Sequence, residues 1–259
     1  MQGRVNESVE SDEHSASRDR RLKSNECHKY RRLPDGGKYM ADIVVFGTAD
    51  TASLAHFYLR HDSPHNVIAF TVTTDYMPPE GEFEGLPVEP FESLPDRYPP
   101  TTVKLFAPMT FRKMNRLRQG IYEQIRTHGY ELITYVSSRA TLFPETRIGS
   151  NCFILENNTV QPYAQIGDNT TLWSGNHIGH HTVIRDHVFI TSHVVIAGHC
   201  DIGNNCVLGI HSTLRDGITL AEGTMVNMDA SVRVDTEPWS VYDGVPAVKR
   251  AVRSDRMAS

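Results

Sequence analysis

Residues 178–201 read IGHHTV-IRDHVF-ITSHVV-IAGHCD, four hexads in succession that each begin with isoleucine. The period of six runs through residues 136–237 without insertion or deletion, and the first position of all seventeen hexads is isoleucine, leucine or valine. This period fits neither an amphipathic helix nor an alternating strand. It is typical of a hexapeptide β-helix, in which three hexads form one coil of a triangular prism. The first positions are Val136, Leu142, Ile148, Ile154, Val160, Ile166, Leu172, Ile178, Ile184, Ile190, Ile196, Ile202, Leu208, Leu214, Leu220, Val226 and Val232.

The aliphatic residues are expected to stack into one core, with each coil buried by its neighbours, so that the ends of the prism need caps. We expect residues 239–247 to cap the last coil. The fifth position of each hexad is mostly small, which is expected to let the backbone turn at a corner. Its small residues include Ala140, Thr146, Cys152, Ala164, Thr170, Thr182, Cys200, Cys206, Ser212 and Ala230.

The chain divides by pattern into four parts. Residues 1–39 are polar, lack apolar periodicity and are expected to be a disordered extension. Residues 40–135 predict a small doubly wound α/β domain, with strands at 42–47, 66–73, 104–107 and 132–136, helices at 52–60 and 111–128, and a loop at 78–90. Residues 136–237 form the predicted left-handed β-helix, and residues 238–259 a cap and tail.

Net charge, apolar runs and cysteine content limit the binding partners and the cellular compartment that we expect. The net charge of −5 gives no support for nucleic acid or a membrane surface as a partner. No apolar run reaches the length of a membrane span, and the N-terminal residues lack the apolar core of a signal peptide. The four cysteines predict buried thiols rather than a disulfide framework. A cytoplasmic location is therefore expected.

Seven of the thirteen histidines fall between residues 177 and 211. A spacing of 18 predicts that His181 stacks with His199 on one corner of the prism and His193 with His211 on another. His187 belongs to the third corner, so evenly spaced histidines do not converge. A zinc-dependent hexapeptide carbonic anhydrase has two ligands five residues apart, and no pair among these seven has that spacing. We therefore expect no metal, and we expect five of the seven to be exposed turn residues.

Acyl transfer is the chemistry that this pattern favours. An attacking alcohol or amine must lose a proton, and neutral imidazole is suited to accept it. Backbone N–H groups at a coil turn can stabilise the oxyanion. A groove between two prisms suits the long pantetheine arm of coenzyme A.

Residues 41–250 resemble the sialic acid O-acetyltransferase family of left-handed β-helix proteins, which includes the UDP-4-amino-sugar N-acetyltransferases. The resemblance rests on the hexads, on Val45-Phe46-Gly47, Ile178-Gly179-His180 and Gly209-Ile210, and on the closing Gly244-Val245-Pro246-Ala247. It implies that His180 is the general base. The family normally has an acid at the next position, where this chain has His181, so Asp186 and Asn176 are the alternative orienting groups. His181, His193 and His211 are rival bases.

The resemblance also implies binding residues. Acetyl-CoA is expected at Phe189, where the family often has histidine, and at Ile210 and Met228, the latter replacing a glycine. Lys249 and Arg250 are expected to reach a coenzyme A phosphate or to form a solvated tail. The nucleotide-sugar acceptor is expected in the small sheet, at Ala49, Asp50, Thr51, Asp75 and Ala107. The loop 47–52 has only one glycine where a dinucleotide fingerprint has three, so the residues alone do not establish a nucleotide.

The sequence thus predicts an acyltransferase that moves acetyl from acetyl-CoA to a hydroxyl or amine of a sugar or sugar nucleotide. The alternative is a non-catalytic β-helix that acts as a scaffold or ligand-binding subunit. Flat parallel faces and threefold closure predict a homotrimer.

Overall fold

The computed structural model describes residues 31–32 and 40–256. These residues belong to one compact unit. The predicted disordered extension lies outside the described residues, apart from β1 (Arg31–Arg32), which pairs antiparallel with β9. None of the helices in the described part of the chain combines the length and apolar character needed to cross a bilayer.

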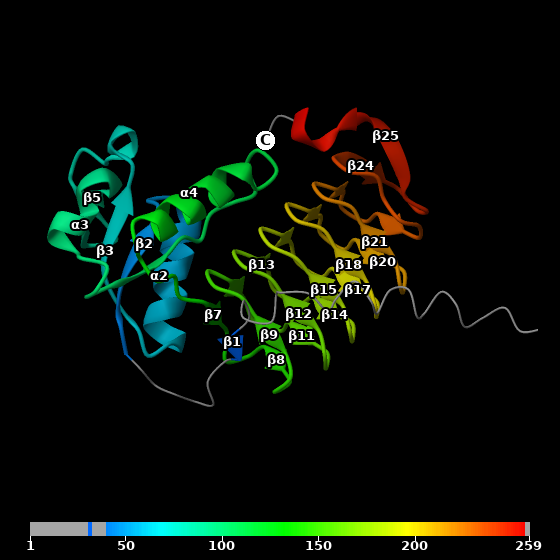
Figure 1. Cartoon of the computed structure of the whole chain (residues 1–259), viewed down its shortest axis with the longest axis horizontal. Coiled ribbons are helices and arrows are strands. Elements are labelled where there is room, and N and C mark those ends of the chain that lie inside the picture. The colour runs from blue at the N-terminus through cyan, green and yellow to red at the C-terminus, as the bar shows by residue number, and fades with distance from the viewer. Residues whose placement is uncertain (1–30, 33–39, 257–259) are drawn as a thin grey trace, which may run out of the picture. The chain divides into compact units, whose positions relative to one another are not determined.

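The hexads form a prism of three parallel faces, as the sequence predicts, and Figure 1 shows its coils following one another in chain order. Each strand is two residues long and pairs with the strand 18 residues further on, as Ile154 does with Leu172. The first face contains β7 (Tyr135–Val136), β10 (Phe153–Ile154), β13 (Thr171–Leu172), β16 (Phe189–Ile190), β19 (Val207–Leu208) and β22 (Met225–Val226). The second contains β8 (Thr141–Leu142), β11 (Thr159–Val160), β14 (His177–Ile178), β17 (Val195–Ile196), β20 (Thr213–Leu214) and β23 (Ser231–Val232). The third contains β9 (Arg147–Ile148), β12 (Gln165–Ile166), β15 (Val183–Ile184), β18 (Asp201–Ile202) and β21 (Thr219–Leu220).

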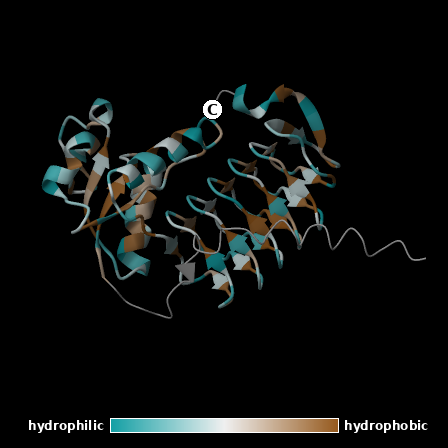
Figure 2. Ribbon diagram, viewed as in Figure 1, coloured by the Kyte–Doolittle hydropathy of each residue, from teal (hydrophilic) through white to brown (hydrophobic). Residues whose placement is uncertain are grey.

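The predicted aliphatic residues form the core of the prism. Fifteen of the seventeen are buried, while Val136 and Leu142, in the first coil, are partly buried. Figure 2 shows hydrophobic residues recurring in successive coils. No helix or long loop interrupts the described prism, which confirms the predicted regularity.

The turn at each corner is made by the fourth hexad position, not the fifth. Fourth-position residues adopt a left-handed backbone, with φ of 58° at His181 and 59° at His193. Asparagine, aspartate and histidine tolerate this conformation better than most residues. This tolerance explains the richness in histidine: five of the seven clustered histidines occupy this position. Four of the five are exposed as expected, and His187 is buried.

A five-stranded sheet in the order β4-β5-β3-β2-β6 forms the small α/β part. Buried residues of α2 pack on one face of the sheet and those of α4 on the other, so the sheet is doubly wound as predicted. Its strands are β2 (Asp42–Phe46), β3 (Asn66–Val72), β4 (Glu82–Phe83), β5 (Leu86–Pro90) and β6 (Lys104–Phe106). Its helices are α2 (Asp50–Asp62), η2 (Thr74–Tyr76), η3 (Phe91–Ser93), α3 (Leu94–Arg97) and α4 (Arg116–Thr127).

Three local expectations in this part were wrong. Residues 78–90 are not all loop, because β5 pairs with β3 and with β4. The helix expected from residue 111 begins at Arg116, because Lys113, Met114 and Asn115 have positive φ. The expected fourth strand also divides: Leu132 makes one bridge to Leu105, whereas β7 belongs to the prism.

The start of α4 is anchored to the first face of the prism. Arg118 is 1% exposed and donates hydrogen bonds to the carbonyl oxygens of Val188, at 3.3 Å, and Asn169, at 2.5 Å. Asn115 donates to the carbonyl oxygens of Asn205 and Cys206. Burial lowers the pKa of Arg118 to about 9, which still leaves it charged at neutral pH.

Strands β24 (Ser240–Asp243) and β25 (Val248–Arg253), followed by η4 (Ser254–Arg256), cap the prism. Strand β24 continues the first face beside β22, and Tyr242 enters the prism core. The predicted cap is thus present. Lys249 contacts Glu237, and Arg250 lies 3.0 Å from Asp243, so both basic residues have acidic partners within the chain.

Candidate active site

Three histidines meet where the second face of the prism turns into the third, and we call His180, His181 and His199 the histidine corner. The rings of His181 and His199 are stacked at 4.9 Å with an interplanar angle of 14°. Neighbouring parallel strands are about 4.8 Å apart, and both residues have the same left-handed backbone conformation. The predicted stacking of this pair is confirmed.

His180 approaches the same place from the third hexad position. Its ring fills space that exists because Gly198 has no side chain: a Cβ on Gly198 would lie 2.7 Å from Cε1 of His180. Its Nδ1 lies 3.1 Å from Nδ1 of His181, so one of these nitrogens donates a hydrogen bond to the other. A second imidazole therefore stands where the resemblance implied a carboxylate beside His180.

Gly179 has a structural role here. A Cβ on Gly179 would come within 2.5 Å of backbone atoms of Ala197 and Gly198 in the next coil. The absence of a side chain at Gly179 thus allows close packing between coils.

Neither orienting group considered from the sequence reaches His180. Asp186 accepts a hydrogen bond from the backbone N–H of Asp168 at another corner. Asn176 is buried and accepts from the N–H of Val194. A carboxylate that was not predicted from the sequence, Asp216, does belong to this corner.

Asp216 extends the column formed by His180 and Gly198, with one member in each successive coil. Its Oδ1 lies 3.1 Å from the point where a Gly198 Cβ would stand, and Nε2 of His180 lies 2.9 Å from the same point. The sequence pattern could have identified Asp216, because it lies two coils of 18 residues each beyond His180.

The three residues expected to bind acetyl-CoA do not lie together in one chain. Phe189 is 3% exposed on the first face, with its ring 5.1 Å from that of Phe111. Ile210 and Met228 are 49% and 68% exposed on the corner between the first and second faces. They lie one coil apart, since the N–H of Asp229 donates to the carbonyl oxygen of Ile210. Neither is on the histidine corner.

Two of the three rival bases, His193 and His211, share that corner with Ile210, whereas His181 belongs to the histidine corner. The rings of His193 and His211 lie 5.5 Å apart with an interplanar angle of 88°, so the two residues share a second corner as predicted, with the rings edge to face. Nδ1 of His211 is 3.7 Å from Oδ1 of Asp229. His211 thus has a nearer carboxylate than His180 and must be tested as a base.

The expected acceptor residues follow the carboxyl ends of β2, β3 and β6, which are parallel strands and therefore end at one edge. Ala49, Asp50 and Asp75 are exposed, and Thr51 is half-buried. Helix α2 begins there without a side-chain cap. Ala107 is buried, and its N–H and C=O both hydrogen bond with Asn151, so it offers no free polar group.

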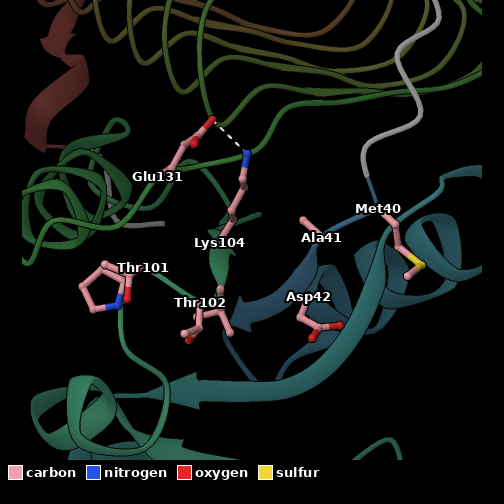
Figure 3. A pocket seen from close by; sticks show the side chains of 9 residues that line it. Met40, Ala41, Asp42, Thr101, Thr102, Lys104 and Glu131 are labelled. Carbon is pink, nitrogen blue, oxygen red and sulfur yellow. Dashed lines mark ion pairs between the residues drawn. The ribbon is translucent and has the colours of Figure 1, made fainter.

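A pocket in the small sheet lies at the opposite edge, where β2 and β6 begin (Figure 3). Met40, Asp42 and Thr102 line it, and Lys104 and Glu131 form an ion pair there at 3.1 Å. Ligands of doubly wound sheets bind beyond the carboxyl ends of the strands. We therefore do not assign the acceptor to this pocket.

The described cysteines are buried thiols, as predicted. Cys152, Cys200 and Cys206 are free, and Cys27 lies outside the described residues. Burial raises the pKa of Cys152 and of Cys206 to about 12. These two thiols are protonated at neutral pH and are not nucleophiles.

Comparison with known proteins gives a family match and several similar structures. Residues 145–180 and 163–198 match the family model described as bacterial transferase hexapeptide (six repeats). No curated protein sequence matches the chain.

Perosamine N-acetyltransferase from Caulobacter crescentus, solved with CoA and GDP-perosamine, is 21% identical with a TM-score of 0.72, covering 82% of this chain and 98% of that chain. The acetyltransferase domain of PglB from Neisseria gonorrhoeae, in complex with acetyl coenzyme A, is 18% identical with a TM-score of 0.73, covering 82% and 100%. WeeI from Acinetobacter baumannii is 16% identical with a TM-score of 0.59, covering 82% and 100%. The chain thus carries bacterial transferase hexapeptide repeats and has the fold of these acetyltransferases, an α/β part followed by a left-handed β-helix.

Proposed function

We propose that this protein is an acetyltransferase that moves an acetyl group from acetyl-CoA to an amine or hydroxyl of a sugar nucleotide. The observation that carries the proposal is the shared two-part fold: the similar structures include one with CoA and GDP-perosamine and one with acetyl-CoA. The similarity extends over the α/β part as well as the prism, since it covers 82% of this chain.

His180 is the proposed general base. It is exposed, and its Nδ1 is held near Nδ1 of His181. When the Nδ1–H of His180 donates a hydrogen bond to Nδ1 of His181, Nε2 of His180 carries the free lone pair that a base needs. His181 then replaces the family's carboxylate as the group that fixes the tautomer and the orientation of the ring.

The reaction follows from these roles. The acceptor nitrogen or oxygen attacks the thioester carbonyl carbon while Nε2 of His180 takes its proton. The tetrahedral intermediate collapses with cleavage of the carbon–sulfur bond, and the coenzyme A thiolate leaves and is protonated. The products are the acetylated sugar nucleotide and free coenzyme A.

The acetyl-CoA groove is proposed to form between neighbouring prisms of a homotrimer. Ile210 and Met228 lie on a different corner from His180, so a donor that touches all three must pass between two chains. The exposed apolar side chains of Val195, Ile210 and Met228 are the kind of surface that a partner subunit covers. The acceptor is proposed to lie beside Asp50 and Asp75, at the strand-end edge of the small sheet.

The test is release of coenzyme A thiol from acetyl-CoA, measured with a panel of amino sugars and GDP-, UDP- and dTDP-linked amino sugars. His180→Ala is expected to lower kcat by about 10² to 10⁴ with little change in acetyl-CoA affinity. His181→Ala should cost less, because it removes an orienting group. His211→Ala and His193→Ala are the matched controls, each removing one exposed corner histidine. If His180→Ala keeps a near-normal kcat while His211→Ala or His193→Ala is inactive, the role of general base passes to that histidine. A protein that releases no thiol with any acceptor would favour the scaffold alternative.

A further inference from the structure

We propose that the histidine corner is a binding site for a divalent transition-metal ion such as Zn²⁺, and that the bound ion blocks acetyl transfer. The site itself depends only on the geometry of the three histidines. Its inhibitory effect rests on the proposed function of His180 as the base.

The three imidazoles already lie at nearly the separation that a metal requires. One ring nitrogen from each of His180, His181 and His199 lies within 4.8 Å of the other two. A tetrahedral zinc site with Zn–N bonds of 2.0–2.1 Å places its nitrogens roughly 3.3 Å apart. The Nδ1 atoms of His180 and His181 are 3.1 Å apart, and rotation of the exposed side chains would bring the three nitrogens to the separation that the metal requires.

The backbone of the prism holds this arrangement in place. His181 and His199 occupy equivalent positions in successive coils, and both have φ of 58°. Gly198 admits the ring of His180, whose centroid lies 4.9 Å from that of His199. Convergence therefore depends on the coil spacing and on one missing side chain, not on a flexible loop.

The chemistry of the ligands selects the metal. Neutral imidazole binds Zn²⁺, Cu²⁺, Ni²⁺ and Co²⁺ in preference to Mg²⁺ or Ca²⁺, which prefer oxygen. Three histidines with an open fourth position are a known ligand set for zinc. All three side chains are exposed, so an ion and its water can enter.

The other histidine pair serves as an internal comparison. Among the described residues, the histidine corner is the only group of three histidine, cysteine or acidic side chains with ligand atoms this close. His193 and His211 also occupy equivalent positions in successive coils, on another corner, but their rings meet edge to face and no third such ligand lies within that distance. His193 has the same backbone conformation as His199, and both are exposed, so it provides a matched control.

A metal in this site opposes catalysis. Coordination uses a ring lone pair of His180. If the metal binds Nε2 the base is no longer free, and if it binds Nδ1 the ring loses the hydrogen bond that orients it. The bound ion thus competes with the substrate proton for the lone pair of His180 and inhibits the reaction.

The experiment is isothermal titration of the full chain with ZnCl₂, after chelator treatment and with a purification tag that contains no histidine. Wild-type protein is expected to show a site of one ion per chain. His199→Ala should weaken this site by at least about tenfold, because one of three ligands is lost, while His193→Ala should leave it unchanged. Circular dichroism verifies that each variant is folded.

A second readout links the site to activity. Zn²⁺ should inhibit wild-type and His193→Ala protein reversibly, with EDTA restoring activity, and should inhibit His199→Ala only at higher concentration, each rate being normalised to that variant's own uninhibited rate. Equal zinc affinity in wild-type and His199→Ala protein, or no saturable binding to wild type, would overturn the proposal. Variant-dependent binding in a protein that transfers no acetyl group would retain the metal site and reject the proposed function.

Discussion

Replacing Gly198 by alanine tests whether the position of His180 matters for catalysis. The new Cβ would lie 2.7 Å from Cε1 and 2.9 Å from Nε2 of His180, and 3.1 Å from Oδ1 of Asp216. Carbon atoms in contact are separated by about 3.5–4.0 Å. The His180 ring must therefore move by roughly 1 Å away from the new methyl group on residue 198.

The expected cost falls on turnover and not on folding. A displacement of roughly 1 Å in a catalytic group lowers rates by about a hundredfold. The side chains that the added methyl group would meet are exposed and able to move, so we expect the midpoint of thermal unfolding to change little. The assay compares kcat from thiol release with unfolding followed by circular dichroism.

Gly179→Ala is the contrasting variant, because its Cβ would meet backbone atoms at 2.5 Å that cannot rotate away. It should destabilise the prism. Gly120→Ala, which lies inside α4 and meets nothing within 4 Å, should leave turnover unchanged and should not lower the midpoint of unfolding, because alanine favours a helix over glycine. The reasoning fails if Gly198→Ala turns over at the wild-type rate, or if it unfolds as readily as Gly179→Ala.

Four further predictions concern the core, pH, assembly and acceptor. Ile196→Asp should abolish cooperative unfolding, because a charge without a partner would replace a side chain that is 0% exposed; circular dichroism would detect this, and a native-like transition would contradict it. Burial lowers the pKa of His187 to about 4, against about 6.5 when unfolded, so only the unfolded chain gains this proton between those values. The contribution of neutral His187 to the free energy of unfolding is therefore complete above pH 6.5, and at most about 3 kcal/mol of it is lost as the pH falls toward 4. Urea unfolding of wild type and His187→Gln at pH 7 and 4.5 should show that the free energy of unfolding depends less on pH in the variant. An equal dependence in both proteins would refute the assignment. Light scattering at micromolar concentration should give the mass of a trimer, whereas a monomer mass would remove the proposed groove. Asp50→Ala and Asp75→Ala should change the Michaelis constant for the acceptor but not for acetyl-CoA, and unchanged acceptor constants would move the acceptor elsewhere.

The sequence by itself determined the prism. A repeat interacts mainly with the coils on either side, so a strict period of six specifies the strands, the buried aliphatic column and the register of 18 residues. The same arithmetic placed His181 over His199 and His193 over His211, because equivalent positions in successive coils must stack.

Only the tertiary structure decided what covers each face and where each ring points. Arg118 docks onto the first face and lies against the ring of the buried Phe189. These contacts join segments about 50 to 70 residues apart in the chain, so no local sequence pattern encodes them. Strand β5 was misread because its prolines resemble loop signals, whereas pairing with β3 and β4 holds it in the sheet. The contact between His180 and His181, and the space that Gly198 leaves for it, depend on side-chain direction across neighbouring coils, which sequence spacing alone does not specify.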